Sequence, residues 1–119
     1  DNYQYWRYKT PFIMTGGTIR EPAECNVIGS QIDIAATLLG MLGIDHQVFT
    51  YSKDLLDSNA PHFAFFTFPD VMGMVTDSSR LVFDNIAGQT ITADGQATDS
   101  LLLKAKAYLQ KLYDDIDKR

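Results

Sequence analysis

The chain has 119 residues, of which 45% are hydrophobic and 21% charged, proportions typical of a single soluble globular domain. Its formal net charge of −5 argues against a general nucleic-acid binder and against a protein that docks on anionic membranes, because both need a basic surface. Its single cysteine, Cys25, excludes an internal disulfide and a zinc site built of cysteines.

The first residues are rich in aromatic side chains. Tyr3, Tyr5, Trp6 and Tyr8 lie close together in a segment that has no initiator methionine. Such a cluster serves either as a binding platform or as packing against a neighbouring part of the protein. We expect the chain to be a piece of a longer protein.

A short buried strand is predicted over Pro11–Met14, an apolar run that ends at Thr15-Gly-Gly-Thr18. Glycines after a strand resemble a phosphate-binding loop, in which backbone N–H groups converge on phosphate oxygens. The P-loop spacing and its lysine are absent, so a plain strand-to-loop turn is favoured. The polar segment that follows, up to Gly29, is expected to be an exposed connection.

A helix with both ends marked is predicted over residues 31–42. Ser30 or Asp33 can accept hydrogen bonds from the N–H groups at its start, and Ser30-Gln-Ile-Asp33 has the spacing of a capping box. We interpret Asp33 as a cap rather than as a catalytic group. Gly43 suits the left-handed residue that ends a helix. An apolar face predicts that the helix is buried, and it consists of Ile34, Leu38, Leu39, Met41 and Leu42.

The second half of the chain alternates short apolar runs with turn residues, which predicts an antiparallel meander. The expected strands cover residues 62–68, 71–75, 80–83 and 89–92. Thr98 or Asp99 would cap a final helix that lies across the sheet. The apolar stripe of that helix consists of Leu101, Ala105, Tyr108, Leu112 and Ile116.

No complete active site can be assembled from these residues. His46 and His62 are the only histidines, and they lack the spacing of a helical metal-binding pair. No serine stands in a nucleophile-elbow context. Cys25 has no histidine in a local signature with it, so we interpret it as an inert thiol.

Three segments, in this order, resemble the C-terminal part of sulfatase-like proteins of the alkaline phosphatase superfamily, most closely the lipoteichoic acid synthase and phosphoglycerol transferase branch. They are Pro11-Phe-Ile-Met14, Gly29-Ser-Gln-Ile-Asp-Ile-Ala-Ala-Thr-Leu-Leu-Gly-Met-Leu-Gly-Ile-Asp45 and Lys53-Asp-Leu-Leu56. The resemblance covers residues 10–56. The chain departs from the family at Ala36, where the family usually has proline, and at Ser52, where it usually has glycine.

This resemblance implies an α/β fold for the parent protein and an α+β fold for the isolated piece. Residues 1–60 would be the end of an alkaline phosphatase-like core, with its last strand–helix unit. Residues 61–119 would be a small antiparallel sheet closed by a C-terminal helix.

The resemblance also implies metal-assisted transfer of phosphoryl or sulfuryl groups. In the family, a Thr, Ser or modified Cys nucleophile acts beside acidic and histidine metal ligands. These groups lie upstream of the matched segments, and Asp1-Asn2 does not match the Asp-His motif that precedes the first one. We therefore expect no catalytic residue and no cofactor in this chain, and a divalent metal (Mn, Mg, Ca or Zn) in its parent.

Within such a parent, this piece would complete the sheet and wall the substrate cleft. The loop from Thr15 to Cys25 leaves the carboxyl end of a core strand, where α/β sites gather, so Thr15, Thr18 and Arg20 are expected nearest the substrate.

The expected partners are the rest of the parent chain and, through the exposed Pro11–Met14 strand, a second copy. We expect no contact with nucleic acid, and none with a membrane, because no apolar stretch approaches the ~20 residues of a membrane helix. The parent would be membrane-anchored and extracytoplasmic (periplasmic or at the cell surface), and this piece itself soluble.

Two other functions stay open at this point. The chain could be a self-standing binding or interaction module, with the aromatic N-terminal segment as its contact surface. It could also be a small enzyme assembled by dimerisation around His46 or His62.

Overall fold

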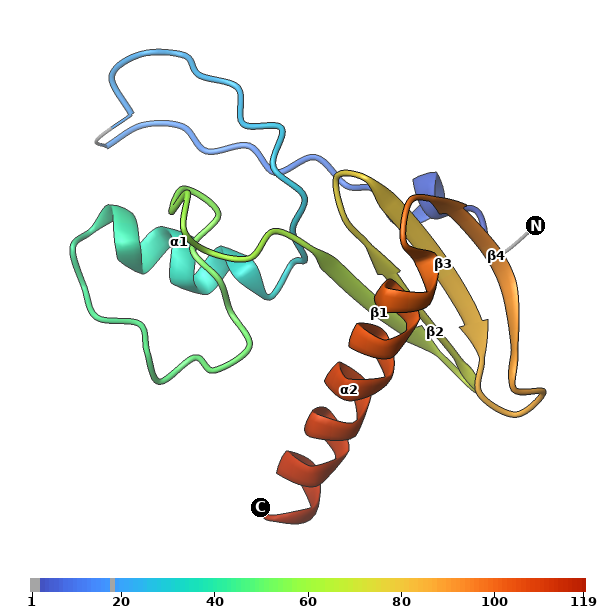
Figure 1. The fold of residues 1–119 in the computed structure, drawn as a ribbon. Coiled ribbons are helices and arrows are strands. Elements are labelled where there is room, and N and C mark those ends of the chain that lie inside the picture. Colours follow the sequence, from blue (N-terminus) through green and yellow to red (C-terminus); the bar gives the residue numbers. More distant parts are fainter. Residues whose placement is uncertain (1–2, 18) are drawn as a thin grey trace.

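The computed structural model describes residues 3–17 and 19–119 (Figure 1). Its elements are, in chain order, η1 (Tyr5–Tyr8), α1 (Asp33–Met41), β1 (Ala64–Phe68), β2 (Val71–Val75), β3 (Ser79–Asp84), β4 (Gln89–Gly95) and α2 (Thr98–Asp117). In the described residues they form a small mixed α/β domain, with one antiparallel sheet of order β1-β2-β3-β4 and two α-helices. The predicted meander and final helix are confirmed.

Short turns fold the meander. Phe68 pairs with Val71, so Pro69 and Asp70 form a two-residue hairpin loop, and Asp70 takes the left-handed conformation at φ 64°. Proline fixes its own φ near −65°, and aspartate tolerates the left-handed region better than most residues, so this dipeptide suits the loop.

The core lies between the sheet and α2. Alternate residues of the central strands point to one face of the sheet, as the two-residue period of a strand requires. The buried cluster on that face consists of Met72, Met74, Leu81, Phe83, Leu101 and Ala105. At the other end of the predicted stripe, Ile116 is 65% exposed, because α2 extends beyond the sheet (Figure 1).

The start of α2 differs from the prediction. Its N-cap is Ala97, in the left-handed conformation at φ 52°, and no side chain caps the helix. Thr98 is already helical because the chain reverses at Ala97, whose carbonyl accepts the N–H of Leu101. The predicted cap by Thr98 or Asp99 is therefore wrong.

The opposite face of the sheet is covered by the aromatic N-terminal segment. The Tyr8 ring stacks on Phe66, with centroids 5.6 Å apart, and Tyr8 and Tyr3 both contact Phe68. Phe66 lies over Gly73 of the neighbouring strand, where an added Cβ would come within 2.1 Å of the ring. Glycine therefore allows the ring to lie flat on β2, and the segment packs on its own sheet.

The predicted strand over Pro11–Met14 is wrong for this chain. The structure assigns no strand to these residues, and Phe12 and Ile13 are exposed. A strand needs a ladder partner, and the described residues place none beside this run. The alkaline phosphatase-like core implied by the resemblance is thus not formed by the described residues alone.

Helix α1 is shorter than predicted but ends as expected. Gly43 is left-handed at φ 66°, its N–H bonds the carbonyl of Gly40, and the N–H of Ile44 bonds the carbonyl of Leu39. These two bonds are the pair that defines a Schellman motif.

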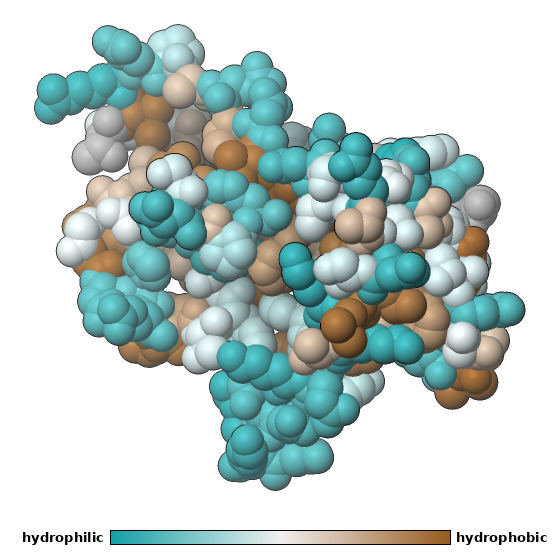
Figure 2. Space-filling model, in the orientation of Figure 1, coloured by the Kyte–Doolittle hydropathy of each residue, from teal (hydrophilic) through white to brown (hydrophobic). Residues whose placement is uncertain are grey.

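The prediction that this helix is buried through its apolar face is wrong. Its buried residues are Asp33, Ala36 and Thr37, whereas Leu38 and Leu42 are 41% and 64% exposed. Helix α2 lies on one face of the sheet and the N-terminal segment packs on β1 at the other, so α1 lies beside the sheet, where Ile34, Leu39 and Met41 are only half-buried. Figure 2 shows hydrophobic patches on the side of the molecule where Figure 1 places α1.

Candidate functional site

The loop predicted to lie nearest the substrate is open to solvent. Thr15 and Arg20 are both exposed, and Thr18 lies outside the described residues. Gly16 and Gly17 are left-handed, and the N–H of Ile19 bonds the carbonyl of Gly16. This is a tight turn, and the described residues of the loop do not line either of the two hollows described below.

The most highly organised polar group in the chain is an ion pair that holds α1. The carboxylate of Asp33 is fully buried, and both of its oxygens lie 2.9 Å from the Nζ of Lys53. It also accepts two backbone N–H groups, that of Lys53 at 2.9 Å and that of Ser30 at 2.7 Å. The Ser30 bond is one half of the predicted capping box.

The other half of the capping box is absent. The hydroxyl of Ser30 accepts the backbone N–H of Phe65 at 3.1 Å instead. Ser30 therefore connects the entrance of α1 to strand β1, and the loss of a local cap is offset by a bond to the sheet.

The rest of the buried face of α1 is also held by hydrogen bonds. Thr37 donates from Oγ1 to the carbonyl of Asp33 at 2.7 Å and accepts the N–H of Leu55 at 3.0 Å. Ser52 accepts the N–H of Ala36 through its Oγ at 2.9 Å. We call the contacts of Asp33, Ala36 and Thr37 with residues 52–55 the α1 lock. These contacts hold the most deeply buried side of the helix largely by hydrogen bonds.

An aromatic cluster joins this lock to the sheet and α2. The Nζ of Lys53 lies 4.1 Å from the ring centroid of Phe63, a cation–π contact. Tyr108 of α2 contacts Phe63, Phe65 and Tyr51, with centroids 4.7–5.8 Å apart. Burial, and then the negative charge of Asp33, raise the pKa of the Tyr108 hydroxyl.

Tyr51 makes the second polar link to α2. Its hydroxyl donates to the carboxylate of Asp115 and lies 3.2 Å from the carbonyl of Lys111. The hydrogen bond to Asp115, followed by desolvation and by the negative charge of that carboxylate, raises the pKa of Tyr51 to about 12. The proton is held because its loss would leave two negative groups in contact.

This shift predicts a loss of stability at high pH. The folded pKa of Tyr51 lies above the unfolded value of 10, so the contribution of the hydroxyl is complete below pH 10 and lost as the pH rises through about 12. Urea unfolding at steps between pH 9 and 12 should show this decline, and Tyr51→Phe should flatten it. Ultraviolet titration should lose one late-titrating tyrosine in the variant. An identical titration of the two proteins would contradict the assignment.

The two histidines have separate surroundings. The Nε2 of His62 lies 3.2 Å from the carbonyl of Asp57, and His46 lies beside Asp54 over Gly40. Within residues 3–17 and 19–119, no three His, Cys, Asp or Glu side chains are grouped so that they could hold a metal. Cys25, the single cysteine, is a free and exposed thiol.

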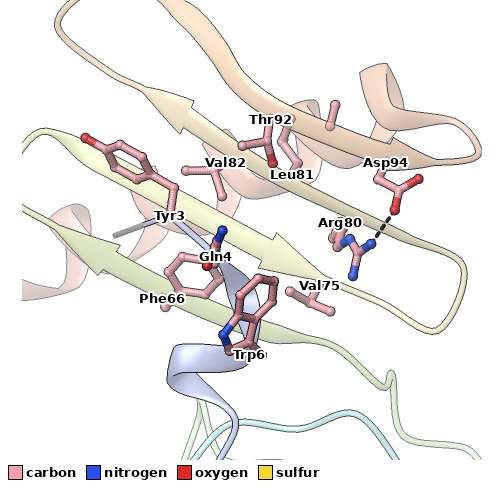
Figure 3. A pocket seen from close by; sticks show the side chains of 11 residues that line it. Tyr3, Gln4, Trp6, Phe66, Val75, Arg80, Leu81, Val82, Thr92 and Asp94 are labelled. Atoms are coloured by element: carbon pink, nitrogen blue, oxygen red, sulfur yellow. Dashed lines mark hydrogen bonds and ion pairs between the residues drawn. The ribbon is translucent and has the colours of Figure 1, made fainter. Parts of the chain in front are cut away.

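Among the hollows that the described residues form, two are the best defined. One, of about 250 Å³, lies between the N-terminal segment and the sheet and is partly open to solvent, and its wall includes Tyr3, Trp6 and the ion pair of Arg80 with Asp94 (Figure 3). The other lies beside α1 and is lined by Ile32, Val48, Phe49, Thr50, Tyr51, Ser52 and Arg119.

Sequence reasoning singled out the aromatic residues of the first hollow but missed its ion pair. Arg80 and Asp94 are cross-strand partners only because a β-bulge lies between β3 and β4. The available signal was two short β-prone runs separated by turn residues, and such a pattern does not reveal a bulge.

Comparisons of this chain with family models, with curated proteins and with solved structures find no match. In the part of the chain that the structure describes, neither α-helix has the length and apolarity needed to cross a bilayer.

Proposed function

We propose that this chain is the C-terminal part of a sulfatase-like, metal-dependent hydrolase of phosphoric or sulfuric esters, or of a phosphoglycerol transferase. In the parent, residues 1–60 complete the α/β core and wall the substrate cleft. The chain alone is catalytically silent. The observation that carries the proposal is the α1 lock.

The lock supports the resemblance because it joins two of its three segments. Asp33 and Thr37 belong to the second segment, and their partners Lys53 and Leu55 belong to the third. Residue types that contact one another across 16–20 positions have a physical reason to occur together. A recurrent pair of segments is expected where each supplies the hydrogen-bond partners of the other.

The two departures from the family pattern also support the proposal. Ala36 and Ser52 contact each other, since the backbone N–H of Ala36 donates to the hydroxyl of Ser52. Proline at position 36 would have no N–H to donate, and glycine at position 52 would have no hydroxyl to accept it. The two exchanges therefore compensate each other.

The exposed apolar face of α1 is the surface that the rest of the parent would cover. Leu38, Leu42 and Ile44 lie on or next to it, and Phe12 and Ile13 are exposed in the run predicted to be a core strand. Contiguous apolar surface of this kind marks a protein interface. In the parent, Pro11–Met14 would become a strand once a neighbouring strand is present.

The proposed substrate contact is the loop with Thr15, Thr18 and Arg20. An arginine fork and threonine hydroxyls are suitable donors for the oxygens of a phosphate or sulfate ester. The metal ligands and the nucleophile would come from the upstream part of a membrane-anchored, extracytoplasmic parent, and a divalent ion held there would polarise the ester.

The test is complementation. The parent truncated before this chain should lose hydrolysis of bis-p-nitrophenyl phosphate or p-nitrophenyl sulfate, and adding the separate chain should restore it. Leu42→Asp should lower the restored rate at least tenfold by placing a charge in the interface. Ile86→Asp, at a still more exposed apolar residue in the turn after β3, is the control and should restore fully.

In the intact parent, alanine at Thr15, Thr18 or Arg20 should raise KM with little change in protein yield. The proposed function would be overturned if the full-length parent hydrolysed neither the phosphate nor the sulfate ester. It would also be overturned if the truncated parent kept its hydrolytic activity. Unaltered kinetics of the three alanine variants would overturn only the role of the loop.

A further inference from the structure

We propose that the hollow between the N-terminal segment and β2–β4 binds one neutral sugar ring. This sugar site is lined by Tyr3, Gln4, Trp6, Phe66, Val75, Arg80, Leu81, Val82, Thr92, Ala93 and Asp94. It lies away from α1 and its lock, so it does not rest on the proposed function.

The size of the hollow sets the size of its ligand. Its volume of about 250 Å³ lies just below the ~300–1,000 Å³ of pockets that hold drug-sized molecules. It is partly open to solvent, and Trp6, Thr92 and Asp94 in its wall are exposed. It can therefore take one six-membered ring, and the opening leaves room for a substituent.

The base and one wall of the site are apolar. Val75 and Val82 are buried in the sheet beneath the hollow, and Phe66 lies beside them. Trp6 stands at the rim and is 62% exposed, although its neighbours Tyr3 and Tyr8 pack on Phe66 and Phe68. An indole exposed at the edge of a hollow offers an apolar face to a flat ligand. The C–H face of a pyranose ring matches such a surface.

The opposite end of the site is polar. Asp94 and Arg80 form a cross-strand ion pair there, and the side chains of Gln4 and Thr92 line the same hollow (Figure 3). Together they supply a carboxylate acceptor, guanidinium and amide donors, and a hydroxyl that does both. Figure 3 places Gln4 beside Trp6 and Phe66, away from Arg80 and Asp94, so the hydroxyls of a sugar would meet donors and acceptors at more than one edge of the ring.

The charge of the site selects a neutral ligand. The positive charge of Arg80 and the negative charge of Asp94 cancel in their ion pair. An anion such as a phosphate would compete with Asp94 for the guanidinium, and a cation would compete with Arg80 for the carboxylate. A neutral polyol bonds both groups without separating them.

The chain's single tryptophan makes the test direct, because Trp6 alone reports this rim in the fluorescence of the whole chain. Methyl glycosides of glucose, galactose, mannose and N-acetylglucosamine are titrated separately. At least one should give a saturable change in Trp6 emission and protection from acrylamide quenching, with Kd on the order of 1 mM, as befits a single ring in an open site.

Asp94→Asn should weaken this binding at least tenfold, because it removes the charged acceptor and the ion pair. The matched control is Asp117→Asn at the exposed end of α2. This variant should bind the glycoside as tightly as the unsubstituted chain does. Calorimetric titration of Trp6→Ala, whose substitution is at an exposed residue, should show a similar loss. If a β-linked disaccharide binds more tightly than its monosaccharide, the natural ligand is a sugar unit of a glycan chain. If the two bind equally, the natural ligand is a free sugar.

Absence of saturable binding by all four glycosides would overturn the proposal. So would equal binding by Asp94→Asn, or tighter binding of inorganic phosphate or of N-acetyltyrosinamide than of any sugar. Circular dichroism of each variant confirms that the sheet is folded. A loss of binding can then be attributed to the substituted side chain rather than to unfolding.

Discussion

Replacing Asp33 with alanine is expected to destabilise the chain by about 3–5 kcal/mol, the loss measured when one partner of a buried ion pair is removed. Lys53 would keep a charged ammonium whose side chain is only 11% exposed, without its counter-charge. The backbone N–H groups of Ser30 and Lys53 would also lose their acceptor. Urea unfolding followed by circular dichroism measures the change in free energy.

Three variants separate the charge from the hydrogen bonds. Asp33→Asn keeps an acceptor oxygen and should lose less than alanine does. Lys53→Met removes the cation and leaves the carboxylate with its two backbone donors. The double variant Asp33→Ala/Lys53→Met should be more stable than Asp33→Ala alone, because no unpaired charge stays buried. Destabilisation by Asp33→Ala of less than ~1 kcal/mol would mean that α1 is not held by the lock.

The parts of the fold that follow from local patterns were predictable. Short apolar, β-prone runs bounded by turn residues identified the four strands, and Gly43 marked the end of α1, because both depend on backbone conformation and on nearest neighbours. The strand over Pro11–Met14 was wrong because strand formation requires a partner that the local sequence does not specify.

The burial of α1 was mispredicted for a related reason. An apolar face indicates that a helix packs against something, but not where that surface comes from. Here the buried side is the polar one, since Asp33 and Thr37 find partners in residues 53–55. Asp33 could be identified as a cap from its position, whereas its pairing with Lys53 depends on a loop of intervening residues whose path the pattern does not fix.

The sugar site shows how one irregularity changes a surface. Phe83 pairs with Thr90, so an unbroken ladder would place Ala93 opposite Arg80. The bulge between Val82 and Phe83 shifts the register by one residue and places Asp94 there instead. A one-residue shift reverses the face to which each side chain points, so the ion pair could not be inferred from residue spacing.

The contact between Ala36 and Ser52 predicts strongly non-additive substitutions. Ala36→Pro alone should destabilise the chain by about 1–3 kcal/mol, because proline has no N–H to donate to the Ser52 hydroxyl and leaves that partly buried group without its partner. The proline ring would also clash with the Ser52 hydroxyl, whose oxygen lies 2.9 Å from the backbone nitrogen of residue 36. Ser52→Gly alone should lose about 1–2 kcal/mol, from one hydrogen bond and the added chain flexibility.

The double variant Ala36→Pro/Ser52→Gly should be more stable than the sum of the single changes predicts, by about 1–3 kcal/mol, because glycine makes room for the ring and leaves no acceptor unpaired. Urea unfolding of all four proteins measures this coupling. A parallel cycle with Ser52→Ala removes the hydroxyl without the flexibility of glycine and should give most of the same coupling. Additivity within ~0.5 kcal/mol would show that the two positions are independent, and would remove the support that their contact gives to the proposed function. A positive coupling would mean that the residue at position 52 decides whether proline is tolerated at position 36.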